Sequence, residues 1–183
     1  MVPNRLYLDT MVFAYYFFQR YKPDFSGKAV RLLKKIEDGK YEGIISILSI
    51  LELIKVIRSN LVEGGNCSPR DWQEAVKEAV KTIYKMKNLE VIEGNPDERL
   101  AISQIQDLLH SSVLWYSFEI INKYPGTVRL EKEKYVHDGL SAGDAMHITL
   151  AKRMGCAKIA TFDHDYKESR GEIEPLMLQE DIF

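Results

Sequence analysis

Residues 6–10 read Leu-Tyr-Leu-Asp-Thr, and residues 158–163 read Lys-Ile-Ala-Thr-Phe-Asp. Each is a short apolar run that ends in an aspartate, which is the pattern of a buried strand with an acid at its carboxyl end. In open α/β sheets, ligands bind at the edge formed by the carboxyl ends of the strands. Two acids at that edge repel each other unless a positive charge lies between them, and a divalent cation is the usual one. The two segments therefore predict a parallel sheet with an acidic site at one edge.

The length and composition of the chain indicate one globular domain. The chain has 183 residues, of which 45% are hydrophobic and 28% are charged, and this length suits a single well-buried core. Its formal net charge of −2 argues against a protein that coats nucleic acid in general, because such proteins are basic. The charge still allows a nuclease whose acids gather at a metal site. We therefore treat 1–183 as one domain.

Other features of the sequence favour a soluble, cytoplasmic protein. Cys67 and Cys156 lie far apart and match no metal or redox spacing, so we expect reduced thiols. The first residues contain no charged region followed by an apolar one, as a secretory signal would. The longest apolar stretch, 43–57, is interrupted by polar residues and is too short to cross a membrane. We expect no membrane partner.

Apolar periodicity and turn residues divide the chain into alternating strands and helices. We expect strands at 5–9, 41–47, 89–92, 157–161 and 173–178. We expect helices at 12–18, 26–38 with Ser26 as its cap, 48–60, 69–87, 97–124 and 142–154. Strands joined through helices of this length form parallel sheets. The pattern predicts one α/β domain with a helical excursion at about 64–135.

Two more acids lie on predicted helices. Glu52 belongs to a narrow polar stripe on an otherwise aliphatic helix, so it either faces water and pairs with Lys55 or lines a cleft. Asp144 follows Ser141 with the spacing of a capping box, which is compatible with a role as a ligand. His147 shares a helical face with Asp144, and we interpret it as a hydrogen-bonded histidine, because a zinc site would need more nitrogen or sulfur ligands.

The strand-end acids also have simpler interpretations. Asp9 either caps the helix that follows it or binds a metal. Asp163 and Asp165 both follow the last long strand, and one of them could form an Asx turn. We rank Asp163 first because it is closer to the strand end, and we treat Asp165 as an auxiliary ligand.

Four segments together resemble the PIN-domain ribonucleases, the group that contains the VapC toxins of toxin–antitoxin pairs. They are Leu-Asp9-Thr10, Ser-Ile-Leu-Glu52-Leu, Gly-Asp144-Ala-Met-His-Ile-Thr-Leu-Ala and Ile-Ala-Thr161-Phe-Asp163-His-Asp165-Tyr. No single segment is specific, but their order and spacing are. The resemblance covers about 5–60 and 138–166. The middle of the chain, 64–135, is longer than in a minimal member of this family. This difference argues against the toxin role more than against the nuclease site.

The resemblance implies a parallel α/β/α sandwich in which four acids converge on one or two Mg²⁺ or Mn²⁺ ions. The quartet would be Asp9, Glu52, Asp144 and Asp163, with Thr10 and Thr161 as polar supports beside it. The implied activity is hydrolysis of RNA, the implied partner is a small antitoxin protein, and we also expect a homodimer. Arg5, Lys55 and Arg58 are candidates to hold the RNA backbone, with solvated surface charge as the alternative for each.

Two other functions compete with this one. A phosphohydrolase that used Asp9 as its nucleophile would commonly carry a second aspartate two residues later, and Met11 stands there instead. A catalytically inactive PIN-like module could bind RNA or a protein partner. The presence of all four acids counts against an inactive module. Binding of Mn²⁺ or Mg²⁺ would distinguish an enzyme from such a module.

Overall fold

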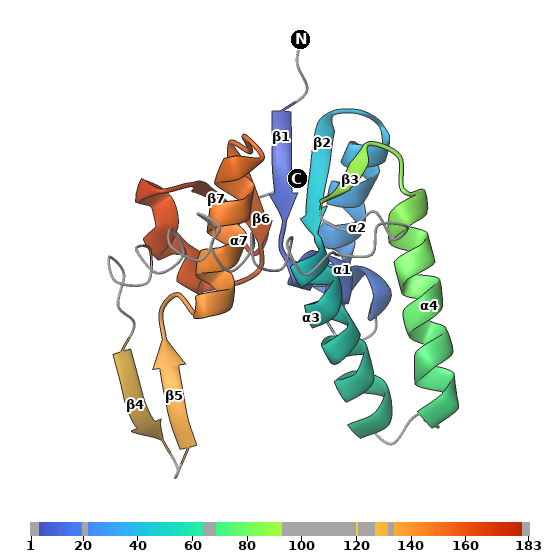
Figure 1. Ribbon diagram of the computed structural model, residues 1–183, viewed down its shortest axis with the longest axis horizontal. Helices are drawn as coiled ribbons and strands as arrows, with labels where there is room; N and C mark the ends of the chain where they lie inside the picture. Colours follow the sequence, from blue (N-terminus) through green and yellow to red (C-terminus); the bar gives the residue numbers. More distant parts are fainter. Residues whose placement is uncertain are drawn as a thin grey trace, which may run out of the picture.

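The computed structural model describes residues 4–19, 22–63, 69–92, 120, 127–131 and 134–180 of the chain. Five strands form one parallel sheet in the order β3-β2-β1-β6-β7 (Figure 1). They are β1 (Asn4–Leu8), β2 (Tyr41–Ser46), β3 (Leu89–Ile92), β6 (Lys158–Thr161) and β7 (Glu174–Met177). Because β1 pairs with both β2 and β6, the end of β1 lies near the middle of the carboxyl edge.

Helices cover both faces of the sheet. They are α1 (Thr10–Phe17), α2 (Pro23–Glu37), α3 (Ile47–Arg58), α4 (Pro69–Lys85) and α7 (Ala142–Arg153), with a π-helical turn at Ser59–Glu63 and a 3₁₀ helix, η2, at His164–Gly171. Side chains of α1 to α4 share one apolar core with Leu6 and Leu8 of β1, whereas α7 shares a second core with Tyr7. The alternation along β1 thus supplies both cores, and the predicted three-layer α/β/α sandwich is confirmed.

Most predicted elements agree with the structure, but the start of α2 does not. Ser26 was expected to cap this helix, and the helix instead begins at Pro23, with Lys22 before it. Proline at the first position has its φ angle already set for a helix and lacks an N–H that would need a partner. That advantage places Ser26 inside the helix, where it is buried.

The middle of the chain differs in part from the helical excursion expected at 64–135. Helix α4 occupies 69–85 as expected, and the predicted helix 97–124 lies outside the described residues apart from residue 120. Strands β4 (Thr127–Glu131) and β5 (Lys134–Asp138) form an antiparallel hairpin that extends beyond the sheet before α7 (Figure 1). Both strand sequences contain β-branched residues, which favour a strand.

Across the described part of the chain, no helix combines the length and apolar character that a membrane crossing requires.

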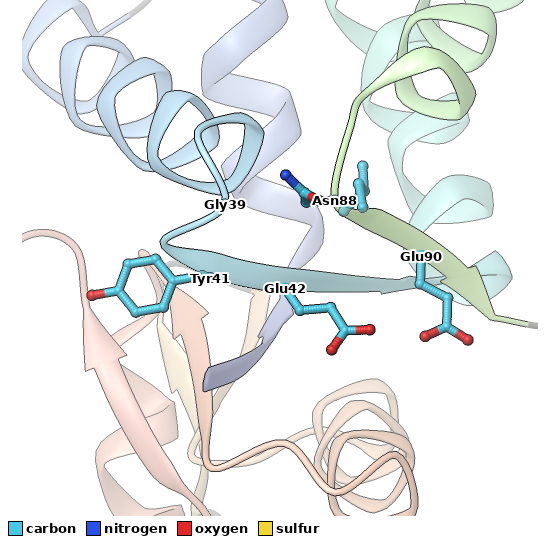
Figure 2. Close-up of a pocket in the computed structure, with 6 residues that line it drawn as sticks. Gly39, Tyr41, Glu42, Asn88 and Glu90 are labelled. Carbon is cyan, nitrogen blue, oxygen red and sulfur yellow. The ribbon is translucent and has the colours of Figure 1, made fainter. Parts of the chain in front are cut away.

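The amino edge of the sheet is held by Arg5. Its guanidinium group pairs with Glu42 of β2 at 3.2 Å and with Glu90 of β3 at 2.6 Å, and it donates to the carbonyl of Met154 at 2.6 Å. The two glutamates point to the same side of their strands and border an open depression of about 490 Å³ (Figure 2). Arg5 therefore links three strands to the end of α7, at the sheet edge opposite Asp9.

We predict that Arg5→Gln lowers the free energy of unfolding by about 1 kcal/mol, since partly exposed ion pairs and one hydrogen bond to a carbonyl are lost. Urea denaturation measures this change. Arg153→Gln is the matched control, because Arg153 is exposed and lies at the end of α7. Equal stability of the two variants would contradict the bridging role of Arg5.

Candidate metal centre

Asp9 lies at the carboxyl end of β1 and is 6% exposed. It occupies the cap position of α1, but its side chain makes no capping hydrogen bond. Its carboxylate instead accepts a hydrogen bond of 2.8 Å from the Thr161 hydroxyl of β6, and its amide donates to the carbonyl of Ala160 at 3.0 Å. The side chain is therefore held beside the neighbouring strand rather than over the helix end.

Glu52 reaches the same edge from α3. Its Oε2 accepts a hydrogen bond of 2.5 Å from the Thr10 hydroxyl and lies 3.0 Å from Nε2 of His147. The side chain is 37% exposed, so one part of the carboxylate faces solvent. The polar stripe on this helix was expected either to face water or to line a cleft. The contacts of Glu52 fit the second alternative.

His147 joins the two acids from the other face of the sheet. Its ring is buried, with Nε2 against Glu52 and Nδ1 at 2.8 Å from the Tyr7 hydroxyl, which in turn donates to Ser46 at 2.7 Å. The expected hydrogen-bonded histidine is thus present. His147 was not predicted as part of the site, although its position one helical turn after Asp144 was the available signal.

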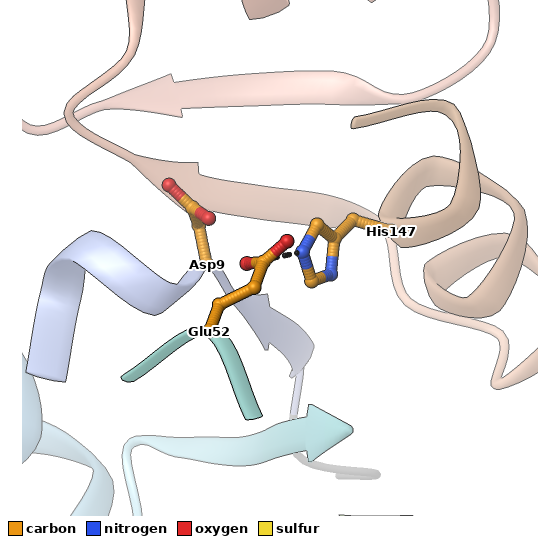
Figure 3. A group of neighbouring side chains, drawn as sticks. All are labelled: Asp9, Glu52 and His147. Atoms are coloured by element: carbon orange, nitrogen blue, oxygen red, sulfur yellow. Dashed lines mark hydrogen bonds and ion pairs between the residues drawn. The ribbon is translucent and has the colours of Figure 1, made fainter. Parts of the chain in front are cut away.

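Asp9, Glu52 and His147 form a group that could hold a metal ion (Figure 3). One potential ligand atom from each lies within 4.8 Å of the others, and the three side chains come from the end of β1, from α3 and from α7. Figure 3 shows the two carboxylates turned toward each other with the imidazole beside Glu52. We call these three residues the acid–histidine cluster.

Asp144 lies next to the cluster, in the first turn of α7. The capping box is confirmed: the Ser141 amide donates to Oδ2 of Asp144 at 2.7 Å, and the Asp144 amide donates to the Ser141 hydroxyl at 3.2 Å. A Cβ atom added to Gly143 would meet Oε1 of Glu52 at 3.3 Å, so the start of α7 approaches Glu52 closely. The absence of a side chain at Gly143 makes this approach possible.

Asp163 and Asp165 follow Thr161 at the end of β6. Asp163 caps η2 by accepting the amide of Asp165 at 3.0 Å, and its own amide donates to the Thr161 hydroxyl at 2.9 Å. Burial, followed by the charge of Asp163, raises the pKa of Asp165. Within the described residues, the metal-capable group brings together Asp9 and Glu52 of the predicted acids and leaves Asp144, Asp163 and Asp165 outside it.

The three candidate RNA-binding cations lie in different places. Arg5 is occupied by its ion pairs at the opposite edge. Lys55 and Arg58 are exposed on α3, and the charge of Lys55 contributes to lowering the pKa of Glu52. These two cations therefore extend from the cluster along the helix that carries Glu52.

The electrostatics of the cluster disfavour the charged form of Asp9, chiefly because this carboxylate is buried. Burial, with smaller contributions from the charges of Asp144 and Glu52, raises the pKa of Asp9 to about 6 despite the lowering effect of His147 and Thr161. Burial acts against the charged forms of Glu52 and His147 as well. Burial is the largest single effect on each, but their mutual hydrogen bond and the surrounding charges together outweigh it, so the pKa of Glu52 is lowered and that of His147 is raised.

These residues fit a hard divalent cation. Carboxylate oxygens are the ligands that Mg²⁺ and Mn²⁺ prefer. A buried carboxylate whose pKa is raised in part by neighbouring acids is a group that a bound cation would stabilise in its charged form. The donor set therefore suits the Mg²⁺ or Mn²⁺ that the sequence resemblance implies.

The fold and the cluster define an α/β protein with a carboxylate-rich site, able to hold a metal ion, at the carboxyl edge of a parallel sheet. Residues 6–171 match the PIN domain, and the chain belongs to the PIN-domain family. The resemblance inferred from four segments is thereby confirmed. No protein with curated annotation has a sequence that matches this chain significantly.

Three solved structures share the fold at low sequence identity. VapC20 of Mycobacterium tuberculosis, described as a toxin that cleaves the sarcin–ricin loop, has a TM-score of 0.54 and 14% identity, with 92% of this chain and 97% of that one covered. FitAcB of Neisseria gonorrhoeae gives 0.53 and 12%, with 96% and 99% covered. VapBC2 of Rickettsia felis, bound to a DNA fragment from its promoter, gives 0.52 and 13%, with 93% and 96% covered.

The raised pKa of Asp9 leads to a prediction about the metal-free protein. A carboxyl group whose pKa rises from 3.8 to about 6 on folding holds a proton in the folded state that the unfolded chain has lost. Folding stability therefore falls as the pH rises through this interval. In EDTA at pH 7, Asp9→Asn should be more stable than wild type by at most roughly 3 kcal/mol, because a rise of about 2 in the pKa of one group corresponds to that free energy.

Thermal unfolding of wild type and Asp9→Asn between pH 4 and pH 7 measures this difference in stability. The pH range spans the ordinary pKa of Asp9, 3.8, and its value of about 6 in the folded protein. The advantage of Asp9→Asn should shrink toward the acidic end. Added Mn²⁺ should stabilise wild type and not the variant. If Asp9→Asn were less stable than wild type at every pH, the charge of Asp9 would not destabilise the metal-free protein, and this prediction would be wrong.

Proposed function

We propose that this chain is a Mg²⁺- or Mn²⁺-dependent endoribonuclease that hydrolyses phosphodiester bonds in RNA. The observation that carries the proposal is the convergence of Asp9 and Glu52, from separate elements, within 4.8 Å of His147 at the carboxyl edge of a PIN-domain sheet. Asp144 contributes its charge from the adjacent helix end. Such a set of acids is costly to bury without a cation.

Each side chain has a distinct role in this proposal. Asp9, Glu52 and Asp144 would supply oxygen ligands to the cation, with Asp163 and Asp165 extending the acidic set at the end of β6. Both ring nitrogens of His147 have hydrogen-bond partners, so this residue would orient Glu52 rather than replace an oxygen ligand. Thr10 and Thr161 donate to Glu52 and Asp9 and keep their carboxylates aimed into the site.

A bound divalent cation makes an attached water easier to deprotonate and neutralises charge on the oxygen that departs from phosphorus. The protein would contribute a rigid and correctly placed set of acids. Lys55 and Arg58 would hold the RNA backbone beside Glu52. We expect products with a 5′-phosphate and a 3′-hydroxyl.

We further propose that the enzyme acts as the toxin of a toxin–antitoxin pair, as a homodimer in the cytoplasm. Support comes from the fold shared with VapC20, which is described as a toxin. This proposal expects a gene for a small protein next to the gene for this chain. It also expects that this small protein neutralises RNA cleavage, which can be tested directly. The competing function, an inactive PIN-like module that binds RNA or a protein, requires that the acid–histidine cluster bind no cation.

We predict that Asp144→Asn lowers Mn²⁺-dependent cleavage of an RNA pool by about 100-fold or more, because even residues behind the ligands of a metal site contribute 10- to 100-fold. Asparagine is nearly isosteric and can accept the Ser141 amide, so the variant should keep its fold. Cleavage is measured on end-labelled RNA, which also identifies the product ends.

Glu74→Gln is the matched control, since Glu74 is an exposed acid on α4 in an i,i+3 pair with Lys77. It should cleave like wild type. Equal activity of wild type and Asp144→Asn would overturn the proposed site. Absence of both Mn²⁺ binding and cleavage in wild type would leave the inactive module as the function.

We also predict that the double variant Lys55→Gln, Arg58→Gln weakens RNA binding and reduces its dependence on salt. Removing two contacts to single-stranded phosphates should lower the slope of log Kd against log salt concentration by about 1.4. Fluorescence anisotropy in Ca²⁺ or EDTA measures binding without cleavage. Lys34→Gln, Lys40→Gln is the control, because both lysines are exposed near the amino edge of the sheet. An unchanged slope would show that Lys55 and Arg58 are ordinary surface charges that do not contact RNA.

A further inference from the structure

Tyr166 is a fully buried tyrosine at the end of the sheet that carries the cluster. It is the third residue of η2, directly after Asp165 and three residues after Asp163, and its exposed fraction is 0%. Its ring packs in the core between the sheet and α7, with Ala145 and Ile148 as partners from that helix. Ala145 follows Asp144, so the tyrosine lies under the helix turn that carries this acid.

The hydroxyl of Tyr166 has no hydrogen-bond partner among the described residues. Buried hydroxyl groups nearly always have one, because an unpaired polar group has lost its water without compensation. A phenylalanine would fill the same apolar core without that cost. The hydroxyl at this position therefore indicates a partner that is provided in another state of the site.

The groups around this hydroxyl identify the partner. Burial and the charges of Asp9 and Asp144 raise the pKa of Tyr166, so Asp144 lies close to this hydroxyl, although the two groups do not have the geometry of a hydrogen bond. A phenol hydroxyl can donate to a carboxylate. Asp9 already accepts from Thr161. The described hydrogen bonds of Asp144 use its amide and Oδ2, which leaves Oδ1 able to accept.

We propose that the Tyr166 hydroxyl donates a hydrogen bond to the Asp144 carboxylate when a divalent cation is bound, and so orients that carboxylate toward the cation. This inference rests on the proposed function. Among the described residues, the Asp144 carboxylate accepts a hydrogen bond from the Ser141 amide. With a cation, the two donors would fix the carboxylate from two directions, as residues behind a metal ligand commonly do. Tyr166 is then a positioning residue that touches neither RNA nor the cation.

The test is Mn²⁺ binding by Tyr166→Phe, measured by isothermal titration calorimetry without RNA. We expect binding about 10-fold weaker than in wild type, the loss typical of a residue that orients a ligand. The melting temperature of the metal-free variant should be equal to or higher than that of wild type, because an unpaired buried hydroxyl is removed. KM for RNA at saturating Mn²⁺ should not change, whereas the Mn²⁺ concentration needed for half-maximal cleavage should rise.

Tyr15→Phe is the matched control, since Tyr15 is a buried tyrosine in the core on the opposite face of the sheet. It should bind Mn²⁺ like wild type. A second comparison uses Asp144→Asn as background: Tyr166→Phe should weaken Mn²⁺ binding no further there, because its acceptor is no longer a carboxylate ligand.

The possible failures are distinguishable. If wild type binds Mn²⁺ and cleaves RNA, and Tyr166→Phe binds Mn²⁺ equally well, this inference is wrong and the proposed function stands. A lower melting temperature of metal-free Tyr166→Phe would overturn it too, since the hydroxyl would then stabilise the metal-free protein. If wild type binds no Mn²⁺, the inference and the proposed function fail together.

Discussion

The hydrogen bond from Thr161 to Asp9 joins the two central strands of the site across the middle of the sheet. It holds a carboxylate that burial and neighbouring acids push toward protonation. Because β1 pairs with β6 in parallel register, the strand ends lie side by side, and Thr161 can donate to Asp9 while it accepts the amide of Asp163. The remaining contacts of the site follow from this one: Thr10 begins α1 beside Asp9 and donates to Glu52, and Glu52 reaches His147.

The local pattern of the sequence was sufficient for the sheet and for two of the acids that meet. Leu6 to Asp9 and Ile159 to Asp163 combine a continuous buried run with an acid at the strand end, and parallel pairing is the outcome that helical connections impose. Glu52 could be placed on the helix after β2 from its polar stripe. The Ser141–Asp144 capping box was also readable, because both partners lie within one helical turn.

What could not be predicted depends on contacts between distant residues. His147 looked like an ordinary helix histidine because its partners, Glu52 and Tyr7, are 95 and 140 residues away. Ser26 failed as a cap because Pro23 offers a better start for the same helix. The hairpin at 127–138 was missed because no strand was predicted between the helices expected at 97–124 and 142–154. The orphaned hydroxyl of Tyr166 is invisible in sequence, where the residue counts only as an aromatic core position.

The site draws on residues from the two ends of the described chain, and this separation has a consequence for protein synthesis. Thr161 is made 152 residues after Asp9 and His147 is carried by α7, so the cluster cannot assemble until both of these later segments have been made. The order β3-β2-β1-β6 leaves β1 without one neighbour until then. Translation itself would thus separate the synthesis of the first acid of the site from the assembly of the whole acid–histidine cluster.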